Sequence, residues 1–367
     1  MKITFVLPTA DLSGGNRVVA TYAERLQNKG HQVQVVSVPH QPLTRQQQIR
    51  SLLKGNGWPS RLTKKPSHFD KTNVPHHVID HKPPIVSSDV PDADVIIATW
   101  WETAEWINAF PPEKGAKAYL IQHHEVFDYL PIDRVKATYR LPLHKITISR
   151  WLDDLMLNEY GNDRSSLVPN SVDTNLFCAP PRSKQKIPTV GLLYSPIAWK
   201  GLDVSLRAFA LAKAQIPNLR LVCFGNCTPP AGFLPEDTAF HLNPAQPDLK
   251  NLYAQCDVWL CGSHQEGFGL PILEAMACRT PIVSTYIGGA IDLIEPGRNG
   301  YILPVGDSAG LAEALVQVIN LPENEWCSLS QAAYSKATTY SWDDATDRFE
   351  AALHEAIAKP MLINSAH

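Results

Sequence analysis

Apolar runs of strand length alternate with amphipathic helical segments along the chain, and this alternation starts twice. In the first half, the apolar run ITFVLP is followed by the loop DLSGG, the helical segment NRVVATYAERLQNKG and the strand-like HQVQVVSV. The second half begins the same series again with PTVGLLYS, KGLDVSLRAFALAKAQ and LRLVCFGN. A strand, helix and strand in succession indicate a crossover between parallel strands. We therefore predict an α/β protein with two parallel-sheet domains that face a cleft. In such sheets, ligands bind beyond the carboxyl ends of the strands.

The length of 367 residues suits two domains of ordinary size. We place the first domain at 1–168 and the second at 169–341, with the crossing at VPNSVDTNLF, and expect a last helix at 342–360 to pack back on the first domain. Residues 40–90 are rich in Pro, Gln, His and Lys and predict a long irregular excursion with one short helix at RQQQIRSLL.

Composition excludes several classes of protein. The chain is 44% apolar and 19% charged, as expected of a globular enzyme, and its net charge of −3 argues against a dedicated nucleic-acid binder. No apolar run approaches the length of a membrane span. The seven cysteines form no CxxC pair, which favours buried thiols over disulfides or a zinc site. We expect a cytoplasmic protein with at most peripheral contact at the inner face of the membrane.

The stretch HQEGFGLPILEA places two glutamates around a turn and a helix start. Gly267 and Gly269 let the main chain approach a ligand closely, and a helix that begins near Pro271 offers a partial positive charge. Glu266 precedes this helix and Glu274 lies about one turn into it, so both carboxylates can face one ligand. An acidic helix start beside a solvated loop glutamate would explain the pair alone equally well.

The longer string resolves this choice by resemblance. DVWLCGSHQEGFGLPILEAMACRTPIVST, with the following GGAIDLIEPGRNGYILPVGD, resembles the retaining glycosyltransferases of family four (group 1), which have the GT-B fold of two Rossmann-like domains. The resemblance is specific in the C-terminal half and weaker over the first 170 residues. It implies that Glu274 holds the nucleotide ribose and that Glu266 lies under the donor sugar near its reacting carbon. The backbone around the helix start would meet the sugar, through Gly267, Phe268, Gly269 and Leu270.

Lys200 stands before a glycine at the opening of the helical segment KGLDVSLRAF, where a lysine and a helix end can share a phosphate. A lone surface lysine would have the same pattern. The family places its diphosphate-binding lysine here and usually adds an arginine several residues upstream. This chain has Leu192 and Tyr194 in that neighbourhood. Candidates to replace the arginine are Arg17, Arg150 and Arg207.

The first domain contributes a glycine pair and a histidine pair. Gly14, Gly15 and Arg17 follow the first strand and open a helix, a geometry explained equally by a tight turn; in the family such a loop faces the donor phosphates. His123 and His124 follow the strand AKAYLIQ. The family has a histidine near the acceptor at this place, and we prefer His123 as that catalytic residue, with His124 on the acceptor side.

Trp100, Trp101 and Trp106 follow another strand end of the first domain. Aromatic faces there suit sugar stacking or a membrane edge, and burial in the core is an equal alternative. We include Trp100 and Trp101 among the acceptor-side candidates.

Two further patterns resemble metal sites, and we assign a metal to neither. DAD at 92–94 precedes a buried strand, where acidic residues commonly mark turns. The histidines of HFDKTNVPHHVIDH lack metal-ligand spacing and predict a solvated loop. We expect no metal ion and no cofactor other than the nucleotide sugar as co-substrate.

The family resemblance, together with these patterns, implies an enzyme, a metal-independent, retaining glycosyltransferase of polysaccharide biosynthesis. The donor expected is UDP-glucose or a similar UDP-hexose, with GDP-mannose second, and the acceptor is a glycan or lipid-linked saccharide. The catalytic residues would be Glu266, His123 and Lys200. A nucleotide-sugar epimerase on a related fold, or a catalytically silent nucleotide-sugar-binding protein, are the alternatives.

Overall fold

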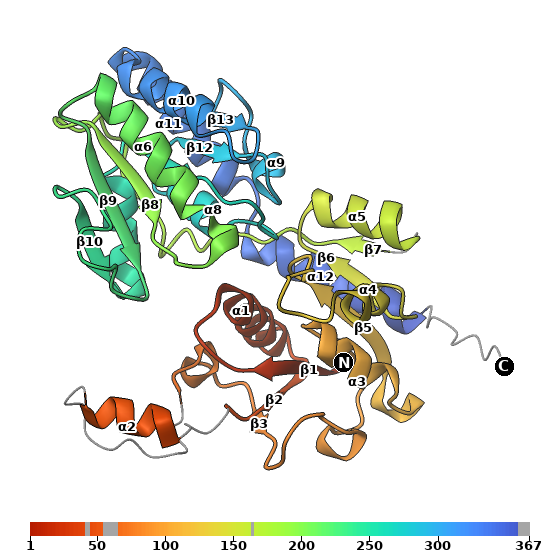
Figure 1. The fold of residues 1–367 in the computed structure, drawn as a ribbon. Helices are drawn as coiled ribbons and strands as arrows, with labels where there is room; N and C mark the ends of the chain where they lie inside the picture. The colour runs from red at the N-terminus through yellow and green to blue at the C-terminus, as the bar shows by residue number, and fades with distance from the viewer. Residues whose placement is uncertain (41–44, 54–64, 163–164, 359–367) are drawn as a thin grey trace. The chain divides into compact units, whose positions relative to one another are not determined.

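The computed structural model describes residues 1–40, 45–53, 65–162 and 165–358, which form two compact units (Figure 1). Unit 1 consists of Met1–Thr147, Leu155–Val168 and the chain from Thr346 onward. Unit 2 consists of Ile148–Asp154 and Pro169–Ala345. The chain therefore passes between the units more often than a single crossing would require: the start of one helix near residue 150 groups with unit 2, and the last helix begins in unit 2 and ends in unit 1.

Unit 1 is built on a seven-stranded sheet in the order β3-β2-β1-β4-β5-β6-β7, and all its pairings are parallel. Its strands are β1 (Lys2–Thr9), β2 (Gln32–Val38), β3 (His76–Val78), β4 (Val95–Ala98), β5 (Ala116–Ile121), β6 (His144–Thr147) and β7 (Ser165–Leu167). Its helices are α1 (Gly14–Asn28), α2 (Arg45–Leu53), α3 (Trp101–Asn108), α4 (Ile132–Tyr139), most of α5 (Arg150–Tyr160) and most of α12 (Trp342–Ala358), with short 3-10 turns at His68–Lys71, Ser87–Asp89 and Pro112–Lys114.

Unit 2 is built on a six-stranded parallel sheet in the order β10-β9-β8-β11-β12-β13. Its strands are β8 (Thr189–Leu193), β9 (Arg220–Gly225), β10 (Ala239–Leu242), β11 (Val258–Cys261), β12 (Ile282–Thr285) and β13 (Gly300–Leu303). Its helices are α6 (Leu202–Gln215), α7 (Leu249–Ala254), α8 (Leu270–Ala277), α9 (Ala290–Leu293), α10 (Ser308–Asn320) and α11 (Glu323–Thr338), with 3-10 turns at Ala198–Lys200 and Gln246–Asp248. The predicted fold class, two Rossmann-like parallel-sheet α/β domains, is confirmed.

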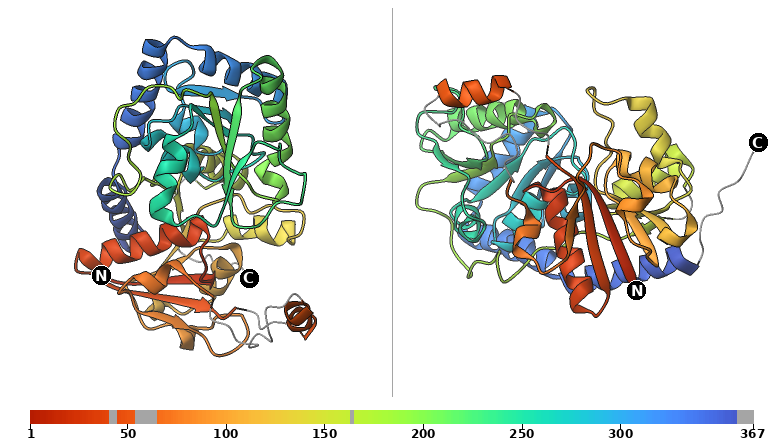
Figure 2. Two further views of the ribbon diagram at one scale, coloured as in Figure 1. Left: turned by 90° about the vertical axis from the view of Figure 1, so that its left-hand side faces the viewer. Right: turned by 90° about the horizontal axis from the view of Figure 1, so that it is seen from below.

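Helices cover both faces of each sheet (Figure 2). In unit 2, α6 packs against α10, and α8 packs against α7 and α11. Covering both faces removes the central strands from water, so β4 (VIIA) and the last four residues of β5 (AYLI) are buried without polar alternation.

Helix α12 is anchored in unit 1 by aromatic packing. Phe349 is fully buried and stacks on Tyr22 of α1 with ring centroids 4.2 Å apart. At the rim of this contact, Glu350 forms an ion pair with Lys29, and its Oε1 lies 2.7 Å from His31 Nε2. The last helix is therefore part of the core of unit 1, not a loose tail.

Several elements differ from the sequence prediction. Part of the region predicted as an irregular excursion is the edge strand β3, whose His76 Nε2 lies 2.8 Å from Ser37 Oγ of β2. Strands β7, β10 and β13 and helices α4 and α11 were also not predicted. The strands among these elements are only three or four residues long and half-exposed, so they show no apolar periodicity.

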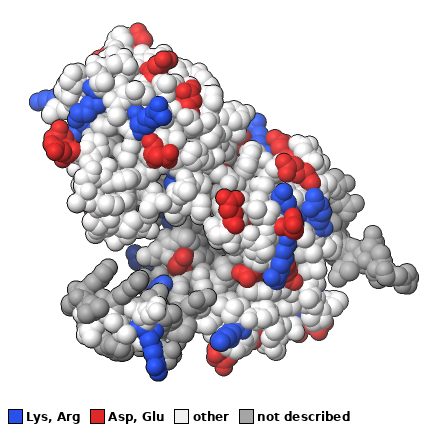
Figure 3. All heavy atoms as spheres, in the orientation of Figure 1, with Lys and Arg blue, Asp and Glu red and all other residues white. Residues whose placement is uncertain are grey.

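None of the described helices is long and apolar enough to cross a membrane. All seven cysteines are free; Cys223, Cys256 and Cys278 are buried, and Cys178 is exposed. Charges of both signs are interspersed on the face shown in Figure 3.

Candidate functional site

The sheet of unit 2 reverses its strand order at β8 and β11. The chain leaves β8 for β9 on one side, and β11 lies on the other side. At such a switch point the loops beyond the two carboxyl ends diverge and leave room for a ligand. Here these loops are 194–201 after β8 and 262–269 after β11, which contain the predicted Lys200 and Glu266.

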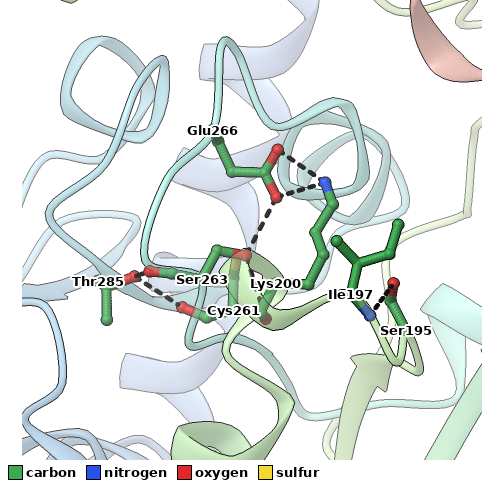
Figure 4. A network of polar contacts seen from close by, with 7 residues as sticks. All are labelled: Ser195, Ile197, Lys200, Cys261, Ser263, Glu266 and Thr285. Atoms are coloured by element: carbon green, nitrogen blue, oxygen red, sulfur yellow. Dashed lines mark hydrogen bonds and ion pairs between the residues drawn. The ribbon is translucent and has the colours of Figure 1, made fainter. Parts of the chain in front are cut away.

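Lys200 and Glu266 meet in this place (Figure 4). Lys200 Nζ lies 2.7 Å from Glu266 Oε1 and 2.9 Å from Oε2. Ser263 Oγ donates to Glu266 Oε1 at 3.0 Å, and Thr285 Oγ1 in turn donates to the carbonyl of Ser263 at 2.6 Å. The two charged side chains are 25% and 13% exposed, so they form a half-buried pair that a ligand can reach.

Close backbone packing brings the two loops together. Gly201 has φ +53°, and a Cβ there would lie 1.9 Å from the carbonyl oxygen of Gly262. The backbone N–H of His264 also donates to the carbonyl of Trp199 at 2.8 Å. Only glycine fits at position 201, and this explains why the chain needs a glycine directly after Lys200.

Helix α8 opens with backbone donors that no acceptor of the described residues uses. Gly269 is its N-cap residue, with φ +89°, and Pro271 follows in the first turn. Within the described part of the chain, the N–H groups of Phe268, Gly269 and Leu270 donate to no acceptor. Successive open amides at a helix start attract anions and polar sugar groups.

Gly288 and Gly289 pack against the backbone of the loop that carries Glu266. A Cβ at Gly288 would lie 2.1 Å from the carbonyl oxygen of Glu266, and one at Gly289 would lie 2.5 Å from that of Phe268. The GGAID string is thus needed for the loop that carries Glu266 to adopt its path.

Glu274 lies on α8 and is only 4% exposed. Tyr253 of α7 donates its hydroxyl to Glu274 Oε2 at 2.7 Å. Tyr253 is fully buried, so it fixes the carboxylate from the core side. Neither Tyr253 nor Ser263 was singled out from the sequence. Ser263 had a usable signal, since it ends a buried strand beside the glycine turn, whereas Tyr253 lies in an ordinary helical pattern.

The neighbourhood of the absent arginine is apolar. Leu192 is 1% exposed, and Tyr194 is 4% exposed with its ring against Phe240, centroids 5.5 Å apart. Of the proposed replacements, Arg150 is paired with Asp292 at 3.3 Å and Arg207 is exposed on α6. Among the described residues, neither arginine forms a hydrogen bond or an ion pair with Lys200 or Glu266. Arg17 belongs to unit 1.

In unit 1, the loop after β1 carries Gly14 and Gly15 at the start of α1, as predicted. Ser13 caps the helix by accepting from the N–H of Asn16 at 3.5 Å. Asp11, not singled out from the sequence, accepts from the N–H of Ser13 at 2.8 Å and from Asn16 Nδ2 at 2.6 Å. The Asp11 carboxylate therefore already accepts two of the hydrogen bonds that this loop could otherwise donate to a ligand.

The loops after β1 and β5 meet, since a Cβ at Gly15 would lie 3.3 Å from Gln122 Nε2. The residue after Gln122, His123, packs its ring on Phe127 with centroids 5.1 Å apart. His124 Nε2 instead lies 2.7 Å from the hydroxyl of Tyr160. Burial lowers the pKa of His124 to about 4, so this imidazole is neutral at pH 7.

Glu125 completes this loop. It is 1% exposed, and its Oε2 accepts from the backbone N–H of Trp101 at 2.9 Å. Burial raises the pKa of the Glu125 carboxyl well above its usual value. This carboxyl ties the loop after β5 to the start of α3.

The tryptophans at the start of α3 and within it differ in exposure. Trp101 is 3% exposed, with the Arg134 guanidinium 5.0 Å from its ring centroid, so its face is not available at the surface for a sugar. Trp100 and Trp106 are half-exposed.

The described residues hold no group of three or more His, Cys, Asp or Glu side chains that could bind a metal ion. The acidic residues of DAD have structural partners: Asp92 pairs with Lys114 at 2.9 Å, and Asp94 accepts from the backbone N–H of Lys2 at 2.6 Å.

Two Rossmann-like units, with a lysine and a glutamate at the strand switch point of the second, define the class of GT-B-type proteins. Comparison of the whole chain supports this assignment. Residues 12–176 match the model described as Glycosyltransferase Family 4, and residues 184–320 match the model described as Glycosyl transferases group 1. Together these matches span most of the chain, and the protein belongs to this glycosyltransferase family.

Individual relatives are more distant. A D-inositol 3-phosphate glycosyltransferase of Mycobacterium avium is 30% identical over 171 residues, which is 43% of this chain and 39% of that protein. The aligned region thus spans less than half of that relative's length. Among solved structures, HepE from Anabaena in complex with UDP superposes with a TM-score of 0.74 at 18% identity, over 97% of this chain and 100% of that one. A sucrose-phosphate synthase from Thermosynechococcus elongatus gives 0.72 at 16%, over 98% and 99%. These two structures share the fold.

Proposed function

We propose that the protein is a retaining glycosyltransferase that moves a hexose from a nucleotide-diphosphate sugar to a glycan or lipid-linked saccharide. The observation that carries the proposal is the Lys200–Glu266 pair beside the open amides of α8, at the carboxyl ends of β8 and β11. The D-inositol 3-phosphate glycosyltransferases and the UDP-bound HepE structure support a sugar nucleotide as donor, with UDP-glucose or a similar UDP-hexose first and GDP-mannose second.

The proposed chemistry is electrostatic. When the bond between the sugar C1 and the diphosphate breaks, negative charge gathers on the leaving diphosphate, and Lys200 with the amides of Phe268 and Gly269 would stabilise it. Glu266 would stabilise the positive charge that develops on the sugar. Glu274 would hold the ribose, in a position fixed by Tyr253. Because these groups supply the positive charge themselves, we propose that transfer needs no divalent metal.

Two routes account for retention at C1. In one, Glu266 forms a covalent glycosyl intermediate; in the other, the acceptor attacks from the face that the diphosphate leaves. Unit 1 would supply the acceptor-side residues. We propose His123 as the catalytic histidine, as the family resemblance favours, and of the tryptophans we keep Trp100, because Trp101 is buried.

The first test is a thermal shift measurement of the whole chain with UDP, GDP, ADP and buffer. A ligand at about 100 times its Kd stabilises the folded state by roughly 2.7 kcal/mol. We expect UDP to give the largest shift and Lys200→Ala to abolish most of it. Lys213→Ala, which removes a lysine of α6 paired with Asp237, is the matched control.

The nucleotide that binds is then tested as its hexose conjugate, with and without EDTA. Transfer to a saccharide with the anomeric configuration kept supports the proposal. Interconversion of the donor without transfer would identify the epimerase, and nucleotide binding without turnover on any acceptor would identify the silent binding protein. A shift with none of the nucleotides would contradict the assignment of the site.

A further inference from the structure

A second cavity lies in unit 2, away from Lys200 and Glu266. Its volume is about 810 Å³, within the range of cavities that hold small-molecule ligands. Helix α11 forms one wall, the turn between α9 and β13 forms another, and the segment around residue 182 and the end of α8 complete it.

Four basic side chains and one acidic side chain line this cavity: Arg182, Arg279, Arg298, Lys336 and Glu295. The wall therefore carries a formal excess of three positive charges in a chain whose net charge is −3. A local excess of this kind opposes the overall charge and raises the concentration of anions at the wall.

Two of the guanidiniums form the inner part of the wall. Arg182 stacks on Trp326 at 4.8 Å and donates to Thr280 Oγ1 at 3.0 Å, while its Nε has no hydrogen-bond partner among the described residues. Arg279 donates from Nε to the carbonyl of Ala179 at 2.9 Å and from Nη1 to Gln331, which leaves its Nη2 without an acceptor in the described chain. Arg279 thus keeps donor capacity beyond its structural contacts, while Arg182 adds a positive charge to the wall.

Arg279 also has an uncommon backbone conformation. It follows α8 with φ +62°, a region in which glycine is usual at the end of a helix. An arginine in this conformation costs about 1 kcal/mol relative to glycine. The chain accepts this cost at a position whose side chain lines the cavity.

The outer part of the wall is held by Glu295. Arg298 Nη1 lies 2.5 Å from Glu295 Oε2, and Lys336 Nζ lies 3.3 Å from Oε1. The side chains of Arg298 and Lys336 are 74% and 33% exposed. Glu295 therefore pairs with both of these cations. An incoming anion would compete with its carboxylate for them.

This cavity is separate from the Lys200–Glu266 site. Asn299 directly precedes β13 and Arg279 lies three residues before β12, so the cavity lies at the amino ends of these strands, while Lys200 and Glu266 lie beyond carboxyl ends. A four-residue strand spans roughly 13 Å. Helix α8 joins the two places, with Gly269 at its N-cap and Arg279 after its end.

We propose that this cavity is a second binding site, for a small phosphorylated molecule, distinct from the proposed donor site. Guanidinium groups bind phosphate oxygens in pairs, and three of them with a lysine match a dianionic or trianionic group. The ligand would displace Arg298 and Lys336 from Glu295.

The experiment is a calorimetric titration of the full chain with inorganic pyrophosphate, in a Lys200→Ala background so that the proposed donor site contributes little. We expect saturable binding that weakens about tenfold in Arg298→Ala and in Lys336→Ala, which corresponds to ~1.4 kcal/mol each. Glu295→Gln removes the competing carboxylate and should tighten binding about fivefold. Lys213→Ala, in another part of unit 2, serves as the control for a general loss of positive charge.

The opposite effects of Glu295→Gln and Arg298→Ala make the outcome decisive, because damage to the fold would weaken binding in both. Circular dichroism of each variant checks folding. Absence of saturable binding, or binding that is the same in all these variants, would overturn the proposal. These readouts do not involve glycosyl transfer, so the proposal stands or fails independently of the proposed function.

Discussion

Lys200 Nζ lies 2.7 Å from Glu266 Oε1, although 66 residues separate the two in the chain. The two side chains form an ion pair, and both sit at the strand switch point of unit 2. A diphosphate that approaches Lys200 must therefore share this ammonium with a carboxylate.

This sharing predicts opposite effects of one substitution on binding and on turnover. Glu266→Gln removes the negative charge that competes for Lys200, so UDP should bind as tightly as to the wild type or more tightly. Turnover should fall by a factor on the order of 100 or more, because a group that stabilises the charged transition state is lost. Calorimetry with UDP and initial rates with the nucleotide sugar measure the two effects. If UDP binding and turnover fall together, Glu266 acts on the fold of the loop and not on the reaction.

The close packing at Gly201 predicts that one added methyl group greatly lowers the free energy of unfolding. In Gly201→Ala the new Cβ would collide with the carbonyl of Gly262 and the residue would keep an unfavourable positive φ, so we expect a loss of more than about 2 kcal/mol in the free energy of unfolding. The same change should abolish the UDP thermal shift, since Lys200 is displaced. Gly232→Ala is the matched control: its φ is +72° but nothing lies within 4 Å of the added Cβ, so it should cost only about 1 kcal/mol. Equal losses in the two variants would show that backbone conformation, and not the close approach of the loops, decides the effect.

The lowered pKa of His124 predicts that part of the stability of unit 1 is lost in acid. Burial lowers its pKa from 6.5 to about 4, so between these values the unfolded chain binds more protons at this residue than the folded chain. Its contribution to stability is complete above pH 6.5 and is lost as the pH falls toward 4. In His124→Gln, the free energy of unfolding should therefore fall less between pH 7 and pH 5 than in the wild type. Urea denaturation at the two pH values measures this difference, and an unchanged difference would contradict the lowered pKa.

Phe349 tests the attachment of α12. Phe349→Ala removes a fully buried ring stacked on Tyr22, and we expect a loss of about 3–5 kcal/mol in the stability of unit 1. His354→Ala, an exposed position on the same helix, should change stability by less than about 0.5 kcal/mol. Denaturation followed by tyrosine and tryptophan fluorescence distinguishes them. A small effect of Phe349→Ala would mean that unit 1 is stable without this contact.

Much of the fold could be read from local patterns. Burial on both faces of a parallel sheet makes ITFVLP and DVWLCGS continuous apolar runs, and packing of one helix face on the sheet imposes the helical period, so β1, β11 and most helices were predictable. Glycines at 201, 267 and 269 marked the turns of the site. Short edge strands such as β3 were not predictable, because two or three ladder contacts leave no periodic trace in the residues.

Only the tertiary structure decided which distant residues contact one another in the site. Nothing local indicates that Ser263 and Lys200 both contact Glu266, that Tyr253 holds Glu274, or that Gly288 passes behind the carbonyl of Glu266. The sequence also did not indicate which of two neighbouring tryptophans is exposed. Trp101 is buried beneath Arg134, while Trp100 is half-exposed. Residue type and spacing reflect the local backbone, so the sequence by itself determined the elements and the turns. Contacts between distant segments depend on how the sheet orders its strands, and this order placed Lys200 against Glu266.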